Sequence, residues 1–118
     1  MIGWRRNFPV SSSGMVRVRG MLGFAMRAGK VVIGTEQVIS ALPSKGRLKL
    51  VLVAEGVSDA TKKKITGKCE FYGVECISLK LSSDDLGDLL GKTYSPAVVG
   101  ITDEGFALQI KKASQTTT

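Results

Sequence analysis

The fold is decided by the stretch Val31-Val32-Ile33-Gly34-Thr35-Glu36-Gln37-Val38-Ile39-Ser40-Ala41-Leu42. Three apolar residues run into a glycine, and an apolar pattern with helical spacing follows two polar residues. This order predicts a short strand, a tight turn at Gly34 and a helix capped by the Thr35 hydroxyl. The amides left over in the first turn of such a helix attract phosphate groups. The turn is therefore the first candidate binding site.

Length and charge limit the class of protein. The chain has 118 residues, of which 43% are hydrophobic, so we expect one globular domain with one core. It carries 17 Lys and Arg against 10 Asp and Glu, which gives a formal net charge of +7. A cationic surplus of this size favours an anionic partner, and nucleic acid is the first choice. The alternative is a charged surface that binds no ligand.

The cysteine content and hydropathy exclude several other classes. The two cysteines, Cys69 and Cys76, form no CxxC pair, and the chain has no histidine, which leaves too few ligands for an ordinary zinc site. We expect both to be buried small hydrophobes in a reducing cytosol, which predicts a cytoplasmic protein. No apolar run reaches transmembrane length, and residues 1–14 lack the apolar core of a secretory signal, so no membrane partner is expected.

The motifs that suggest catalysis are weak. The absence of histidine excludes Ser-His-Asp and Cys-His mechanisms. Residues 87–93 resemble a phosphate loop, but three residues instead of four separate the glycines, and the motif follows a helical pattern. Asp84, Asp85 and Asp88 fall in the first turns of an expected helix, where acidic residues offset its dipole. We predict no enzyme, no cofactor, no metal site and no small-molecule substrate.

Helix and strand patterns alternate along the rest of the chain. Val18, Met21, Leu22 and Ala25 mark one face of a first helix, which Gly29 ends. Further strands are expected at residues 48–54, 74–79 and 97–101, and further helices at 58–72, 82–91 and 103–112. The expected N-caps of these last three helices are Ser58, Ser82 and Asp103. Such alternation predicts an α/β fold with helices on both faces of the sheet.

A run of cations, Lys62-Lys63-Lys64, lies in the third expected helix. The apolar stripe of that helix is Ile65, Cys69 and Tyr72, so the lysines stay outside the core. A solvated helix face is the first interpretation of the run. The alternative is peripheral contact with phosphates, which would appear as salt dependence of binding.

The two ends are expected to lie outside the domain. Residues 1–14 contain a Ser-Ser-Ser-Gly run and are predicted to be a flexible N-terminal arm. The arm is alternatively a basic, aromatic contact for nucleic acid, a cloning remnant or an over-long start, since Met15 and Met21 offer later starts. Residues 15–113 are predicted to form the single domain, and residues 114–118 a frayed tail.

Several segments together resemble one known family. They are residues 34–38 (Gly-Thr-Glu-Gln-Val), the strand at 48–54 and residues 96–101 (Pro-Ala-Val-Val-Gly-Ile), in this order. With them the chain resembles the L7Ae/L30e ribosomal-protein family of kink-turn RNA binders. Residues 21–30 and 102–107 make it most similar to the short bacterial YlxQ-type members. The resemblance implies a three-layer α-β-α sandwich with a mixed, about four-stranded sheet.

The resemblance also implies a set of RNA-binding residues. In this family the glycine turn and the start of the second helix enter a bent RNA, and the two polar residues after the turn contact guanines of sheared G·A pairs. The loop before the last strand packs apolar groups against an extruded nucleotide, and an aromatic ring there can stack on a base. The candidate RNA-binding residues are therefore Lys30, Gly34, Thr35, Glu36, Gln37, Ser40, Lys92, Thr93, Tyr94, Ser95, Pro96 and Ala97.

Two candidate residues depart from the family pattern. Many members carry asparagine or lysine where Glu36 stands, and a carboxylate there accepts hydrogen bonds from guanine but repels phosphates. Ser40 stands where a basic residue is common, and it lacks that charge and reach. These departures predict a weak affinity for kink-turns or a different RNA.

The expected function follows from the resemblance. We expect a non-catalytic, ribosome-associated protein that recognises structured, kink-turn-like RNA, with ribosomal RNA as one candidate partner. We expect a monomer in the absence of RNA. The alternative is a protein–protein interaction module of the same fold, and salt-dependent binding of RNA separates the two.

Overall fold

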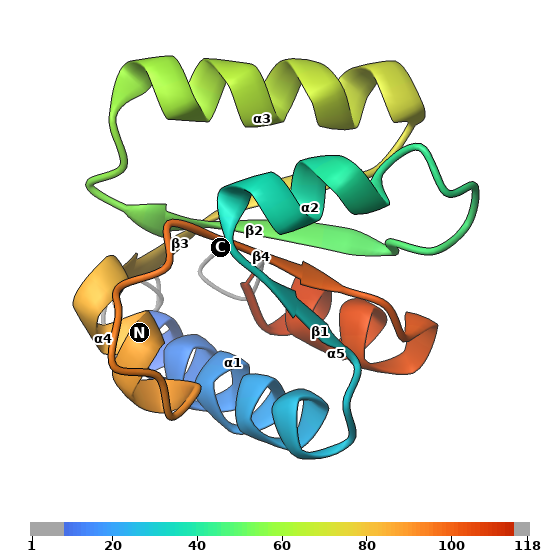
Figure 1. Cartoon of the computed structure of the whole chain (residues 1–118). Helices are drawn as coiled ribbons and strands as arrows, with labels where there is room; N and C mark the ends of the chain where they lie inside the picture. The colour runs from blue at the N-terminus through green and yellow to red at the C-terminus, as the bar shows by residue number, and fades with distance from the viewer. Residues whose placement is uncertain (1–8, 115–118) are drawn as a thin grey trace.

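The structure, a computed structural model, describes residues 9–114, with side chains described from Val16 onward. The described elements in chain order are α1 (Pro9–Arg27), β1 (Val31–Ile33), α2 (Thr35–Ala41), β2 (Leu50–Glu55), α3 (Asp59–Tyr72), β3 (Cys76–Ser82), α4 (Ser83–Leu89), β4 (Val98–Ile101) and α5 (Glu104–Ser114) (Figure 1). Helices and strands thus alternate as the sequence predicts, although several ends differ. The strand predicted at residues 74–79 starts later and runs to Ser82, because its pairing with β2, and not its apolar content, sets its length.

The four described strands form one mixed sheet in the order β1-β4-β2-β3. β4 is antiparallel to both of its neighbours, β1 and β2, whereas β2 and β3 are parallel. Every residue of β4, and every residue of β2 except Glu55, is buried. Such nearly unbroken apolar runs suit strands that are covered on both faces. The predicted mixed sheet of about four strands is confirmed.

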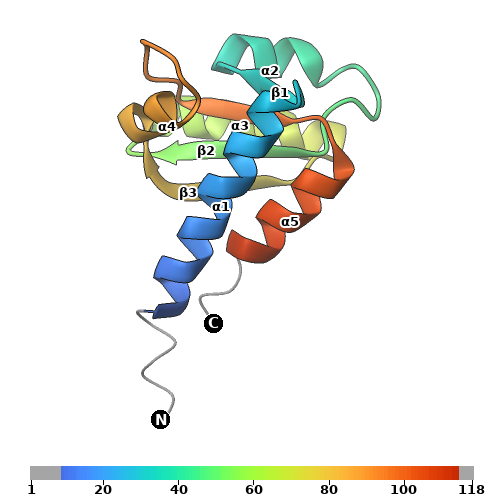
Figure 2. The same ribbon diagram turned by 90° about the horizontal axis from the view of Figure 1, so that it is seen from below.

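Helices cover both faces of this sheet, with α2 and α3 on one side and α1, α4 and α5 on the other (Figures 1 and 2). Alternate residues of β2 point into the two layers, as expected for a strand. Leu50 and Leu52 pack with the buried residues of α1, α4 and α5, whereas Val51 and Val53 pack with those of α2 and α3. The fold is therefore the predicted three-layer α-β-α sandwich.

The first helix starts earlier than the sequence predicts. The predicted apolar face is confirmed, since Val18, Leu22 and Ala25 are buried and α1 packs along α5. The helix begins at Pro9, however, so residues 9–14 belong to it and not to a flexible arm. Predictions for residues 1–8 and 115–118 lie outside the described residues.

The predicted N-caps of the three later helices are confirmed. The Ser58 hydroxyl accepts a hydrogen bond from the Thr61 amide at 3.3 Å, and the Ser82 hydroxyl accepts one from the Asp85 amide at 3.1 Å. The Asp103 carboxylate accepts one from the Phe106 amide at 2.9 Å. These bonds satisfy amides that a helix leaves without an internal acceptor, so the sequence alone sets these helix starts.

The predicted apolar stripe of α3 is only partly buried. Ile65 and Cys69 are 0% and 1% exposed, but Tyr72 is 38% exposed. Tyr72 is the last residue of α3, before Gly73 ends the helix in the left-handed conformation with φ 71°. Its ring packs edge-on against Phe71, with 4.9 Å between the ring centroids. Tyrosine tolerates this position because its hydroxyl prefers water.

Close packing joins α4 to the loop that precedes β4. Gly87 is buried in α4, and a Cβ there would clash with the Tyr94 carbonyl oxygen and press on the Pro96 ring. The loop backbone therefore lies directly against the helix at a point where only glycine fits. Residues 87–93, which resemble a phosphate loop in sequence, are the last three residues of α4 and the turn after it, in which Leu90 is buried.

This packing predicts that Gly87→Ala lowers the free energy of unfolding by about 1–3 kcal/mol, because a backbone oxygen has to move. Chemical denaturation measures the effect. Gly67→Ala is the matched control, since Gly67 is an exposed residue of α3 and nothing lies within 4 Å of an added Cβ. The control should be more stable than the parent chain by roughly 0.5–1 kcal/mol. A Gly87→Ala variant as stable as the Gly67→Ala variant would contradict the packing argument.

Candidate nucleic-acid interface

The turn between β1 and α2 depends on the backbone of Gly34. Its φ of 109° and ψ of 149° lie in a region that only glycine adopts readily. Gly34 is itself the N-cap of α2, and no side chain caps the helix. The predicted cap by Thr35 is therefore wrong. The chain reverses direction at Gly34, so Thr35 is already the first helical residue and its hydroxyl cannot take the capping position.

The sheet brings this turn beside the loop of residues 92–97. Because β1 and β4 are antiparallel, the end of β1 lies next to the start of β4. The Gly34 amide donates a hydrogen bond to the Val98 carbonyl oxygen at 2.8 Å. On the other side of β4, the Ala54 amide donates to the Ala97 carbonyl oxygen, also at 2.8 Å. Two predicted site segments that are distant in sequence thus meet at one edge of the sheet.

Lys30 lies away from the other candidate residues. Its carbonyl oxygen accepts a hydrogen bond from the Thr102 amide at 2.9 Å, which places it at the opposite end of β1 from Gly34. At the rise of an extended chain, the two residues are about 13 Å apart. The structure thus joins the Gly34 turn to the end of the loop at Ala97 and groups Glu36, Gln37 and Ser40 on α2, but it leaves Lys30 apart from both.

The outer face of α2 carries an open hollow of about 320 Å³. The predicted site residues Glu36, Gln37 and Ser40 line it, and Arg47 joins them from the loop between α2 and β2. The Arg47 amide donates to the Ser44 carbonyl oxygen at 3.0 Å, in a tight turn that brings the chain back toward α2. Sequence reasoning missed Arg47, because helix periodicity does not say where a loop residue points.

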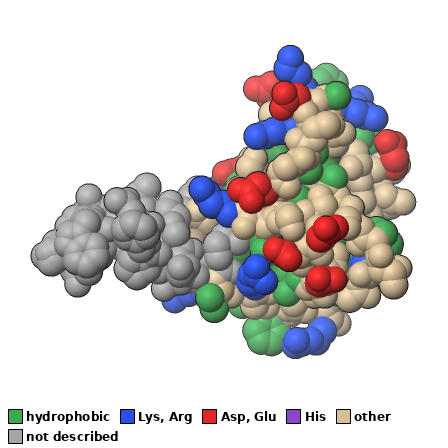
Figure 3. Space-filling view, turned by 90° about the vertical axis from the view of Figure 1, so that its left-hand side faces the viewer, with side chains coloured by type: hydrophobic (Ala, Val, Ile, Leu, Met, Phe, Trp, Pro, Cys, Tyr) green, Lys and Arg blue, Asp and Glu red, His purple; other side chains and the backbone are tan. Residues whose placement is uncertain are grey.

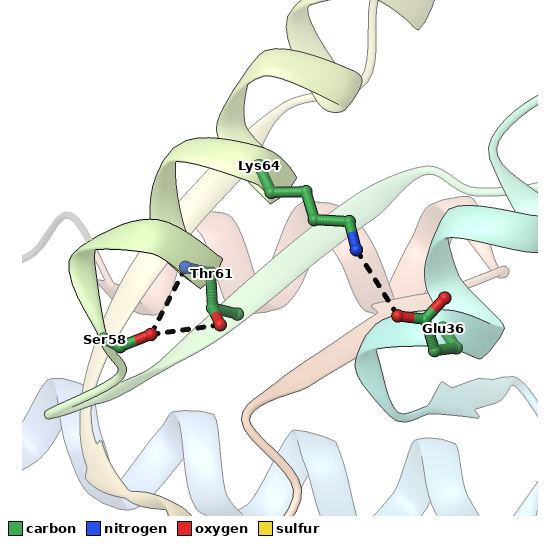
Figure 4. A network of polar contacts seen from close by, with 4 residues as sticks. All are labelled: Glu36, Ser58, Thr61 and Lys64. Carbon is green, nitrogen blue, oxygen red and sulfur yellow. Dashed lines mark hydrogen bonds and ion pairs between the residues drawn. The ribbon is translucent and has the colours of Figure 1, made fainter.

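A second cation reaches this face from α3 (Figure 4). Lys64 Nζ lies 3.5 Å from Glu36 Oε2, and both side chains are largely exposed. Lys64 therefore offsets the carboxylate charge that would otherwise repel a phosphate. An exposed ion pair of this kind contributes little to stability, so it separates easily when a stronger partner arrives. The pair joins residues 28 positions apart, which no local pattern in the sequence reveals.

The loop of residues 92–97 is held by α4. The Ser95 hydroxyl donates to the Asp84 carboxylate, and the Lys92 amide donates to the Gly87 carbonyl oxygen at 2.8 Å. The Tyr94 side chain is 53% exposed, so its ring is free to stack while the backbone of the loop stays fixed. Asp84, predicted only to offset the dipole of its helix, also positions this loop.

The charged side chains next to the site differ between its α4 side and its α2 side. Figure 3, which views the molecule from the α4 side, shows acidic and basic side chains interspersed over that face. The first turns of α4 carry Asp84, Asp85 and Asp88, next to the loop. On the α2 side the loop to β2 adds Arg47, and α3 adds Lys64. A polyanion is therefore favoured over α2 and α3 and disfavoured over α4.

Other chemically active groups lie away from this face. Within residues 9–114 no three His, Cys, Asp or Glu residues are placed to hold a metal ion, and no helix is long and apolar enough to cross a bilayer. Cys69 is buried as predicted, but Cys76 is only half-buried. A hydrogen bond from the Cys69 thiol lowers the pKa of Cys76 and raises the pKa of Cys69.

Comparison with known proteins identifies the family. The ribosomal protein L7Ae/L30e/S12e/Gadd45 family matches residues 17–111. The chain belongs to this family. It is 44% identical over 87 residues to the RNA-binding protein YlxQ of Bacillus subtilis (strain 168), which covers 74% of this chain and 84% of that protein. It is 36% identical over 96 residues to the RNA-binding protein YlxQ of Enterococcus faecium, with 81% and 89% coverage.

A solved structure shares the fold of this chain. A protein of unknown function from Bacillus halodurans C superposes with a TM-score of 0.77 at 30% identity, over 83% of this chain and 96% of that one. The family match and the two YlxQ relatives confirm the family resemblance inferred from the sequence.

The geometry of the turn predicts that Gly34→Ala lowers the free energy of unfolding by about 1–3 kcal/mol, since its φ of 109° is strained for any side chain. Urea denaturation measures the loss. Gly73→Ala is the control: Gly73 has φ 71°, in the ordinary left-handed region, where the cost is about 1 kcal/mol. Equal losses in the two variants would show that the turn is no more strained than an ordinary helix end.

Proposed function

We propose that this chain is a non-catalytic, ribosome-associated protein that recognises structured, kink-turn-like RNA. The proposed RNA face consists of the Gly34 turn, the outer face of α2 and the loop of residues 92–97. The observation that carries the proposal is the hydrogen bond from Gly34 to Val98, which places the turn and the loop side by side. Membership of the family, and two relatives named as RNA-binding proteins, support it.

The residues of this face suit the recognition of unpaired or non-canonically paired bases. Gln37 offers both a donor and an acceptor to a guanine edge, and its amide oxygen lies over Gly34, where a Cβ would clash with it. The Glu36 carboxylate offers acceptors. The exposed ring of Tyr94 offers a surface on which a base can stack.

Positive charge at this face comes from outside α2. Ser40 has no charge, but Arg47 lines the same hollow and Lys64 lies beside Glu36. A guanidinium pairs with a phosphate through two parallel hydrogen bonds, which favours Arg47 as the main phosphate contact. We infer that Arg47 takes over the role of the basic residue that is common at position 40.

The partner and setting follow from the same proposal. Ribosomal RNA is the first candidate ligand, since the family is named for ribosomal proteins. We propose that the free protein is a monomer and that it works in the cytoplasm. Both cysteines are free thiols, which suits a reducing compartment.

Titration of a kink-turn RNA tests the proposed function. The parent chain should bind it, and Gln37→Ala should weaken binding by about 1–2 kcal/mol, or roughly five- to thirtyfold, through loss of a contact to a base. Gln109→Ala is the matched control, since Gln109 is an exposed glutamine of α5 on the other face of the sheet. No binding by the parent chain, or equal affinities of the two variants, would contradict the proposal and favour a protein-interaction module.

Arg47→Gln should weaken the binding of the same RNA and flatten its dependence on salt, because one cation fewer displaces counterions. Lys49→Gln is the control, since Lys49 belongs to the same loop but does not line the hollow. Adding Ser40→Lys to the Arg47→Gln variant should restore affinity and salt dependence, because the two positions share the hollow. Failure of this restoration in a folded double variant would show that the two residues do not serve one phosphate.

A further inference from the structure

The outward side of α3 carries an exposed stripe of two cations and two aromatic rings. We define the α3 stripe as Lys64, Lys68, Phe71 and Tyr72. The first three are spaced four and three residues apart and so lie along one side of the helix, and the Tyr72 ring contacts the Phe71 ring. The Phe71 side chain is 80% exposed and the Tyr72 side chain is 38% exposed. Their rings meet edge-on with 4.9 Å between centroids and an angle of 87° between the ring planes, so they form one aromatic cluster whose larger exposed surface belongs to Phe71.

The Phe71 ring adds little to the core packing of α3. Phe71 buries little of its surface, and phenylalanine is a weaker helix former than alanine. The core contacts of α3 come instead from Ile65 and Cys69, on the side that faces the sheet. An exposed aromatic group of this kind marks an interaction surface when neighbouring groups fit one partner.

The neighbouring groups fit a single strand of nucleic acid. Lys68 lies one helical turn before both rings, and Lys64 lies one turn before Lys68. Surfaces that bind single-stranded nucleic acid combine lysines placed along the phosphate backbone with aromatic rings on which bases stack. Phe24 offers a contrast, since it is an exposed ring of α1 that lies 5.3 Å from its own cation, Arg27, and on the other side of the sheet.

The α3 stripe is continuous with the proposed RNA face. Its first residue, Lys64, contacts Glu36 of α2 at 3.5 Å (Figure 4). From there the stripe extends eight residues, or about 12 Å, to Tyr72 at the end of the helix. A strand that leaves the RNA face in the other direction meets the acidic first turns of α4. Charge therefore favours an exit across α3.

We propose that the α3 stripe binds unpaired nucleotides that flank the structured RNA, with phosphates at Lys64 and Lys68 and a base stacked on the Phe71 ring beside Tyr72. This inference rests on the proposed function, because the structured part of the RNA is held by the RNA face. It assigns to Lys64, the last residue of the charge run, and to Lys68 the role of a second RNA contact, beyond that of a solvated helix face.

The test compares a blunt kink-turn RNA with the same RNA carrying an unpaired tail of about six uridines, a length within the range of single-strand sites. Tails on the 5′ and the 3′ end are tested separately. The parent chain should bind one of the tailed RNAs about fivefold or more tightly than the blunt RNA. Phe71→Ala should abolish this gain and leave the affinity for the blunt RNA unchanged.

A second test variant, Lys68→Gln, and two matched controls accompany Phe71→Ala: Phe24→Ala is the control for Phe71→Ala, and Arg19→Gln is the control for Lys68→Gln. Phe24→Ala removes an exposed phenylalanine from the other side of the sheet and should keep the gain. Lys68→Gln should reduce the gain and flatten the salt dependence by about 0.7 in slope for the tailed RNA only. Arg19→Gln, which removes an exposed cation from α1, should change neither.

The outcomes separate this inference from the proposed function. Binding of the blunt RNA that depends on Gln37, with no gain from either tail, would overturn the α3 stripe and leave the proposed function intact. A gain that survives Phe71→Ala, or that Phe24→Ala also removes, would overturn it as well. Absence of binding to every one of these RNAs would overturn the proposed function itself.

Discussion

The pairing of β4 with both of its neighbours is the constraint on which the rest of the structure depends. β4 is buried throughout, and its antiparallel pairing with β1 and β2 fixes which chain segments meet at its start. The bond from Gly34 to Val98 extends this pairing one step into the turn. A loop and a turn about 60 positions apart along the chain thereby become one surface, held by main-chain bonds that no exposed side chain has to supply.

Around this edge, rigid backbone and loosely held side chains are combined. The loop before β4 lies against Gly87 and is tied to Asp84 through Ser95, so its backbone needs little further ordering when a ligand binds. The polar groups on α2 are exposed, and the ion pair between Glu36 and Lys64 is weak enough to exchange. A fixed frame with exchangeable charges suits a polyanion, since it limits the loss of entropy on binding while cations rearrange around phosphates.

The cations of this surface come from elements other than the one that the family pattern emphasises. Ser40 leaves α2 without a basic residue in its exposed face, while Arg47 and Lys64 approach the same face from a loop and from a neighbouring helix. Charge is a property of the surface and not of a sequence position, because Coulombic attraction depends on distance in space. A chain can therefore lose the basic residue at one position and keep a cationic site.

The sequence by itself determined the alternating elements, the three-layer fold, the caps at Ser58, Ser82 and Asp103, and the importance of Gly34, because these depend on local periodicity and local hydrogen bonds. Only the tertiary structure decided that Arg47 and Lys64 lie beside the candidate site, and that Phe71 and Tyr72 stand exposed. These features depend on how loops return and how helices pack side by side. Such contacts join residues far apart in the chain, and a one-dimensional pattern carries no distance between them.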